Sequence, residues 1–134
     1  HVDGVDLNCG CPQRWALEEG IGASLLERCR WERVATMLKD ARGLAAGRSI
    51  SVKVRVNADP TQTVEMVKRF AATGVDWITV HGRTPSQKPS DPVDFEQIKL
   101  VRESLCIPVI ANGNVFTVED ADCIHTQTGV QGVM

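Results

Sequence analysis

The sequence has no long apolar run and almost no excess of charge of either sign. None of its hydrophobic stretches is long enough to span a bilayer, and no signal-peptide pattern opens the chain, so a membrane protein is not indicated. Lys and Arg number 15 and Asp and Glu number 17, which gives a formal net charge of −2. Free-standing nucleic-acid-binding domains are normally basic, so this charge argues against one, while a local basic patch remains compatible with it.

The cysteines show neither a disulfide framework nor a zinc-ligand spacing. Their number is odd, and the Cys9-x-Cys11 pair has no second pair or histidine at zinc-finger distance. We therefore expect no metal site and a reducing compartment. That points to a cytoplasmic location, with a nuclear or mitochondrial pool as the alternative. The five cysteines are Cys9, Cys11, Cys29, Cys106 and Cys123.

What the sequence does contain is a regular alternation of strand and helix patterns. Hydrophobic residues make up 43% of 134 residues, enough for one modest domain or part of a larger one. Period-two or apolar segments predict strands at 2–7, 50–56, 75–80, 108–113 and 129–134. Helical spacing predicts helices at 31–41, 59–71, 95–105 and 117–128, with a short helix broken by glycines within 15–27.

Helical crossovers between successive strands predict a parallel sheet. Two architectures fit, an open doubly wound sheet or part of a (β/α)8 barrel. No Gly-x-Gly-x-x-Gly follows any predicted strand, which weakens the dinucleotide-binding open sheet. We expect the α/β class, as part of a TIM (β/α)8 barrel.

The barrel is also favoured by polar residues at successive strand ends. In a barrel these ends converge on one mouth, where catalysis takes place. Each residue has a simpler explanation, such as a buried structural cysteine, a structural histidine, a common Asn-Gly turn or solvated surface cations. Their recurrence at equivalent positions favours a shared site. The residues are Asn8, Cys11, Lys53, Arg55, His81, Arg83 and Asn112.

Five motifs together resemble the tRNA-dihydrouridine synthases, in the family's order and over essentially the whole chain. The form Cys-Gly-Cys-Pro-Gln-Arg-Trp-Ala, from Cys9 onward, is most similar to the eukaryotic branch that modifies positions 20a and 20b of the tRNA D-loop. The motifs are Asp-Leu-Asn-Cys-Gly-Cys-Pro at 6–12, Gly-Ala-Ser-Leu-Leu at 22–26, Val-Lys-Val-Arg at 52–55, Val-His-Gly-Arg-Thr at 80–84 and Pro-Val-Ile-Ala-Asn-Gly at 108–113.

The resemblance implies an FMN-dependent barrel that reduces uridine to dihydrouridine in tRNA, with NADPH as the reductant. It implies hydride transfer from FMN to C6 of the uracil and proton transfer from Cys11 to C5. A cysteine thiol is mostly protonated near neutral pH, so it can serve as the acid. The target uridine would have to leave its stack to reach the flavin.

The resemblance also assigns the remaining site residues. Lys53 and His81 correspond to flavin-binding residues, and Asn112, Gly113 and Asn114 to a phosphate-binding turn. The family pattern has Asp where this chain has Asn114, a change that a backbone contact would survive and a side-chain role would not. Contacts with the target base or nearby phosphates are expected from Asn8, Arg55 and Arg83.

By the same resemblance, residues 1–134 form the central part of the flavin-binding barrel. Further strands on both sides and a helical tRNA-binding domain would lie outside this stretch, a view that fits His as the first residue. Two rival functions stay open, another FMN barrel such as a dihydroorotate dehydrogenase-like enzyme, and a non-catalytic tRNA-binding relative. The sequence makes no prediction about the oligomeric state.

Overall fold

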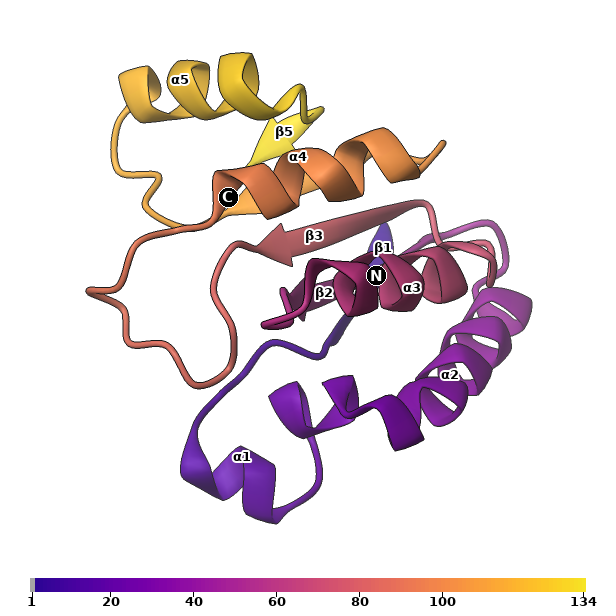
Figure 1. Cartoon of the computed structure of the whole chain (residues 1–134). Coiled ribbons are helices and arrows are strands. Elements are labelled where there is room, and N and C mark those ends of the chain that lie inside the picture. The colour runs from indigo at the N-terminus through magenta and orange to yellow at the C-terminus, as the bar shows by residue number, and fades with distance from the viewer. Residues whose placement is uncertain (1) are drawn as a thin grey trace.

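Five parallel strands lie side by side in the same order as along the chain, in a computed structural model that describes residues 2–134 (Figure 1). Every neighbouring pair is parallel, and the register places Asn8 opposite Lys53 and His81 opposite Asn112. The strands are β1 (Gly4–Asn8), β2 (Ser49–Arg55), β3 (Trp77–His81), β4 (Val109–Asn112) and β5 (Gly132–Val133).

The longer helices pack in a row, each against the next and against the sheet (Figure 1). They are α2 (Trp31–Leu44), α3 (Pro60–Ala71), α4 (Phe95–Ser104) and α5 (Val118–Thr128). A doubly wound sheet would reverse its strand order at a switch point, whereas this order runs straight from β1 to β5. The sheet is therefore a wall of a (β/α)8 barrel, which confirms the predicted fold class.

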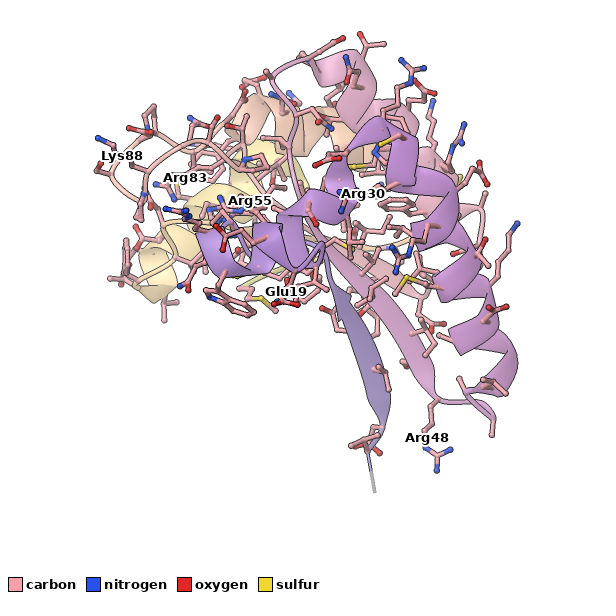
Figure 2. The ribbon with its side chains drawn as sticks, turned by 90° about the horizontal axis from the view of Figure 1, so that it is seen from below. Glu19, Arg30, Arg48, Arg55, Arg83 and Lys88 are labelled. Carbon is pink, nitrogen blue, oxygen red and sulfur yellow. The ribbon has the colours of Figure 1, made fainter. Side chains whose placement is uncertain are left out.

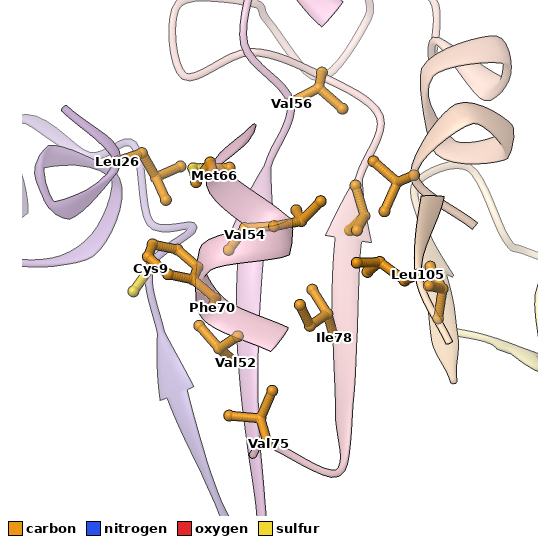
Figure 3. Close-up of a cluster of buried hydrophobic side chains, with 14 of the residues drawn as sticks. Cys9, Leu26, Val52, Val54, Val56, Met66, Phe70, Val75, Ile78 and Leu105 are labelled. Carbon is orange, nitrogen blue, oxygen red and sulfur yellow. The ribbon is translucent and has the colours of Figure 1, made fainter. Parts of the chain in front are cut away.

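The hydrophobic core lies between the sheet and these helices (Figure 3). Val52 and Val54 of β2 point into it and meet Phe70 of α3, and all three side chains are fully buried. Trp31, the first residue of α2, is also buried, and its indole nitrogen donates to Leu26 O. Alternation along β2 then turns Lys53 and Arg55 to the opposite face, away from the helices.

Local sequence signals fit most of the helix ends, although α2 runs to Leu44, three residues past the predicted residue 41. The Asp59 side chain accepts a hydrogen bond from Thr61 N, with Pro60 in the first turn of α3. Thr117 and Asp120 form a reciprocal capping box at the start of α5, and Gly129 ends that helix in a left-handed conformation with φ 69°. The segment before α2 is broken as predicted, into α1 (Arg14–Glu18) and the 3-10 turns η1 (Gly22–Leu26) and η2 (Arg28–Arg30).

Several predicted strand boundaries were wrong. β1 starts at Gly4 instead of residue 2 and continues to Asn8, and β2 is shifted one residue earlier than predicted. β3 starts at Trp77 rather than Val75, because Val75 is buried in the core and Asp76 closes the turn by accepting from Ile50 N at 2.7 Å. β5 is much shorter than the predicted 129–134.

Candidate active site

The polar strand ends predicted from the sequence do meet at one edge of the sheet. In parallel strands paired residues face the same side, so the register puts Asn8, Lys53, Arg55, His81 and Asn112 on the face without helices. Arg55 and Arg83 lie together at this end, near the loop that carries Lys88, while Arg48 lies at the opposite end (Figure 2). The cations therefore gather where the strands end.

Cys11 lies on a loop whose backbone makes three hydrogen bonds, two with strand β2 and one with η1. Arg55 Nε donates to Gly10 O at 2.6 Å, and Cys9 N donates to Lys53 O at 2.8 Å. Ala23 N donates to Cys11 O at 2.8 Å, which ties η1 to the loop. The Cys11 side chain is partly exposed and lines a hollow of about 320 Å³ together with Asn8 and Trp15.

Gly22 makes the close approach of η1 to this loop possible. Its φ is +59°, and a Cβ at this position would lie 2.6 Å from Cys11 O and 2.9 Å from Cys11 Cβ. Only glycine can occupy such a position without a shift of the backbone. This glycine therefore accommodates the Cys11 loop.

The neighbouring cysteine, Cys9, has a different environment. Its side chain is fully buried in the hydrophobic core beside Val52 and Phe70 (Figure 3). Burial, and secondarily the nearby Asp6 carboxylate, raise the pKa of the Cys9 thiol to about 12. Cys9 is therefore a core residue and Cys11 is the thiol presented at the site.

Lys53 is oriented by Asn112. Lys53 Nζ donates to Asn112 Oδ1 at 2.8 Å, and Asn112 Nδ2 donates to Met134 O at 2.8 Å. Burial lowers the pKa of Lys53, and Arg55 lowers it further, while Asp6 opposes the shift. An ammonium held in partly desolvated surroundings attracts an anion more strongly than one in water.

Arg83 is buried, with 4% of its surface exposed, and each of its three nitrogens has a partner. Nε donates to Asp91 O at 2.6 Å and one terminal nitrogen donates to Asn114 Oδ1 at 2.8 Å, while the other lies 3.3 Å from His81 Nε2. Burial, and then the charges of Arg55, Lys53 and Arg83, lower the pKa of His81 to about 4.

The turn after β4 has the backbone shape of an anion-binding site. Gly113 has φ 125° and Asn114 has φ 55°, and the N–H groups of Gly113, Asn114 and Val115 donate no hydrogen bond within residues 2–134. Successive free N–H groups in such a turn form a cradle for phosphate. The turn and the adjacent cations Lys53 and Arg83 thus fit the phosphate and the electron-rich ring of a flavin mononucleotide.

Sequence reasoning missed two contributors to the site. Asp6 lies on the same face as Asn8 and accepts a hydrogen bond of 2.6 Å from Ser51 Oγ. Its spacing of two residues from Asn8 was the available signal. Thr84 O accepts from the Arg55 guanidinium at 3.3 Å, a contact that links β2 to the loop after β3 and has no local sequence signal.

Within residues 2–134 no group of three or more His, Cys, Asp or Glu side chains is arranged to hold a metal ion. In the same part of the chain, no helix has the length and apolar character needed to cross a membrane.

Comparison with known protein families shows to which family this chain belongs. The family model described as "Dihydrouridine synthase (Dus)" matches residues 1–134. This chain belongs to the dihydrouridine synthase family. The motif-based resemblance is thereby confirmed.

Curated dihydrouridine synthase relatives match the whole chain. It is 43% identical to a Homo sapiens protein named "tRNA-dihydrouridine(20a/20b) synthase [NAD(P)+]-like", over 100% of this chain and 42% of the relative. It is 38% identical to the Schizosaccharomyces pombe "tRNA-dihydrouridine(20a/20b) synthase [NAD(P)+]", over 100% of this chain and 41% of that one. The chain thus spans about two fifths of the length of these relatives.

Solved structures support the same fold for this dihydrouridine synthase family chain. Dihydrodipicolinate synthase from Agrobacterium tumefaciens aligns with a TM-score of 0.67 at 13% identity, over 99% of this chain and 42% of that structure. A mandelate oxidase aligns with a TM-score of 0.55 at 20% identity, over 72% of this chain and 34% of that one. At these identities the likeness concerns the fold alone.

Proposed function

We propose that this chain forms part of an FMN-dependent tRNA-dihydrouridine synthase that reduces uridine in the tRNA D-loop, at positions 20a and 20b, with NADPH as the reductant. The observation that carries the proposal is the position of Cys11. Its partly exposed thiol stands on a loop that Arg55 holds at 2.6 Å through Gly10 O, beside a cluster of cations at the strand ends. The names of the human and fission yeast relatives support both the substrate and the positions.

Cys11 is proposed as the acid that adds a proton to C5 of the uracil. Reduction of the C5=C6 bond requires a hydride at C6 and a proton at C5, and reduced FMN supplies the hydride when bound. The thiol would lose its proton to C5 and be left as a thiolate. Burial and Arg83 lower the pKa of Arg55, and the nearby Cys11 opposes that shift, so a thiolate at Cys11 and the Arg55 guanidinium would stabilise each other.

The remaining residues would bind and orient. Lys53 and His81 would face the flavin ring, and the turn at 112–114 would hold its phosphate through backbone N–H groups. This assignment explains how Asn114 can replace the family's Asp, because the amide oxygen still accepts from Arg83 and the backbone contact needs no side chain.

Asn8 and Arg55 are proposed to contact the extruded uracil or nearby phosphates. Asn8 Oδ1 already accepts from Gly10 N at 2.9 Å, so its amide nitrogen is the group left to bind a substrate. Arg83 differs from these two residues, since all three of its nitrogens have partners within the protein. We therefore assign Arg83 to the support of the site rather than to direct contact with tRNA.

The decisive experiment measures dihydrouridine in tRNA by nucleoside mass spectrometry. A strain lacking its own enzyme would carry the full-length gene as wild type, as Cys11→Ala, or as Cys106→Ala, a matched control at an exposed cysteine. Wild type and Cys106→Ala should restore dihydrouridine. Cys11→Ala should form dihydrouridine at least about 10²-fold more slowly, because a general acid usually accelerates its step by at least that factor.

Each failure has a separate meaning. If Cys11→Ala restores dihydrouridine as well as wild type does, Cys11 is not the acid. If wild type restores none although it is expressed and contains flavin, the substrate is wrong, and activity on free dihydroorotate would support the dehydrogenase-like alternative. A colourless full-length protein that still binds tRNA would support the non-catalytic alternative.

A further inference from the structure

Two neighbours, Arg83 and the turn at Gly113, lie against the Nε2 edge of the His81 ring. Its Nε2 lies 3.3 Å from a terminal nitrogen of Arg83. A Cβ on Gly113 would lie 3.1 Å from His81 Cδ2 and 3.3 Å from Nε2, so the turn after β4 closes on the same edge. The other ring nitrogen, Nδ1, has no hydrogen-bond partner within residues 2–134. Every buried polar side-chain atom in these residues has a partner, so Nδ1 cannot be a buried atom. Nδ1 therefore lies on the open edge of the ring.

The guanidinium of Arg83 can only donate hydrogen bonds, so it cannot accept one from a proton on His81 Nε2. It carries only N–H donors and does not lose its charge in proteins. Hydrogen bonds to Asp91 O and Asn114 Oδ1 fix its orientation, and 4% exposure leaves it little freedom to turn. A proton on His81 Nε2 would point at these donors, so Nε2 must accept and the proton must reside on Nδ1.

Other charges around the ring also disfavour a second proton on the imidazole. Lys53 and Arg55 reach the same face from β2, and with Arg83 they oppose a positive charge on the imidazole. The uncharged Asn112 and Asn114 are the other polar side chains close by on β4 and its turn. The ring therefore stays neutral near neutral pH.

We propose that Arg83 is a positioning residue that fixes His81 as the neutral Nδ1–H tautomer, so that His81 offers a hydrogen-bond donor to a bound ligand. The ligand atom facing His81 must then be an acceptor, such as a carbonyl or phosphate oxygen. That this ligand is a flavin rests on the proposed function, whereas the tautomer follows from Arg83 and His81 alone.

The test is nuclear magnetic resonance of the full-length protein labelled with ¹⁵N in its histidine rings. The His81 signals are assigned by their loss in His81→Gln, and the two ring nitrogens are distinguished by their couplings to the ring carbon-bound protons. Wild type at pH 7 should show a protonated Nδ1 and an unprotonated Nε2. A protonated Nε2, whether in the other neutral tautomer or in the imidazolium, would overturn the proposal.

The role of Arg83 is tested with Arg83→Met, which keeps the bulk of the side chain and removes every donor. The expected spectrum is a mixture of both neutral tautomers, with the His81 pKa moved upward. Arg33→Met removes the same charge from an exposed position on α2 and should leave the His81 signals unchanged. A pure Nδ1–H form in Arg83→Met would show that Arg83 does not select the tautomer. If that variant does not fold, the wild-type spectrum still decides whether the Nδ1–H form exists.

The result is independent of activity on tRNA. A wild-type protein that makes dihydrouridine but protonates Nε2 would overturn this inference and leave the proposed function standing. A protein that lacks this activity but still shows the Nδ1–H form would overturn the proposed function and leave this inference standing.

Discussion

Lys53 Nζ donates a hydrogen bond of 2.8 Å to Asn112 Oδ1, and this contact joins β2 to β4 across the intervening β3. The two side chains come from strands far apart in the sequence, yet both lie on the face that the helices leave open. The contact ties the position of a cation to the strand that leads into the anion-binding turn. Cofactor binding at this end of the sheet should therefore depend on the Lys53 side chain.

Loss of the Lys53 charge should weaken flavin binding. A charge-assisted hydrogen bond is worth about 1.5–3 kcal/mol, so Lys53→Met should lower flavin affinity roughly 10- to 100-fold. The measurement is flavin absorbance per mole of purified full-length protein, followed by titration with FMN. Lys68→Met, at an exposed position on α3, is the matched control. Equal affinity in the two variants would remove Lys53 from the cofactor site.

The two neighbouring cysteines should differ sharply in reactivity. The raised Cys9 pKa of about 12, against 9.0 for an ordinary thiol, implies a thiolate fraction about 10³-fold smaller, and the side chain is also buried. Iodoacetamide at pH 8 should therefore label Cys11 in the native protein and label Cys9 only in denaturant. Peptide mass spectrometry reports both sites. Labelling of native Cys9 at the rate of Cys11 would contradict its placement in the core.

Acidification should destabilise the protein through His81. Its pKa falls from 6.5 to about 4 on folding, so between these pH values the unfolded chain binds a proton that the folded chain does not. Stability therefore falls as the pH drops from about 6.5 to about 4. Urea unfolding across this range should show a smaller loss for His81→Gln than for wild type, because the other groups titrate in both. Identical pH profiles would show that the His81 pKa is not lowered.

A methyl group at position 22 should disturb the Cys11 loop. Gly22→Ala places a Cβ 2.6 Å from Cys11 O in a left-handed conformation, which alone costs about 1–2 kcal/mol. We expect lower stability in urea unfolding and a changed rate of Cys11 alkylation. Gly43→Ala is the control, because Gly43 lies in α2 and a Cβ added there would have nothing within 4 Å, so this variant should be neutral or stabilising. A neutral Gly22→Ala would contradict the close contact.

Sequence patterns predicted the order and type of every strand and long helix, because apolar spacing reflects burial against a sheet directly. Capping residues such as Asp59 and Thr117 also indicated where helices begin. Strand ends were less accessible to prediction. β3 starts late because the Asp76 carboxylate accepts from Ile50 N, a contact between residues 26 positions apart that no local pattern encodes.

The composition of the site was partly predictable for the same reason. Polar residues at strand ends are visible in the sequence, and barrel geometry brings them together. Their individual environments are not visible, because they depend on partners from other strands. Arg83 looked like a candidate for substrate contact, and only the fold shows it buried against Asp91 O and Asn114 Oδ1.

The clustering of cations at the strand ends should affect the stability and abundance of the protein in the cell. Burial and mutual repulsion lower the pKa of both Lys53 and Arg55, so this end of the sheet holds positive charge at an energetic disadvantage. An anion bound among these groups relieves the repulsion and stabilises the folded chain by mass action. Protein abundance would then follow the supply of the anion, because chains that lack it unfold more readily and are degraded sooner.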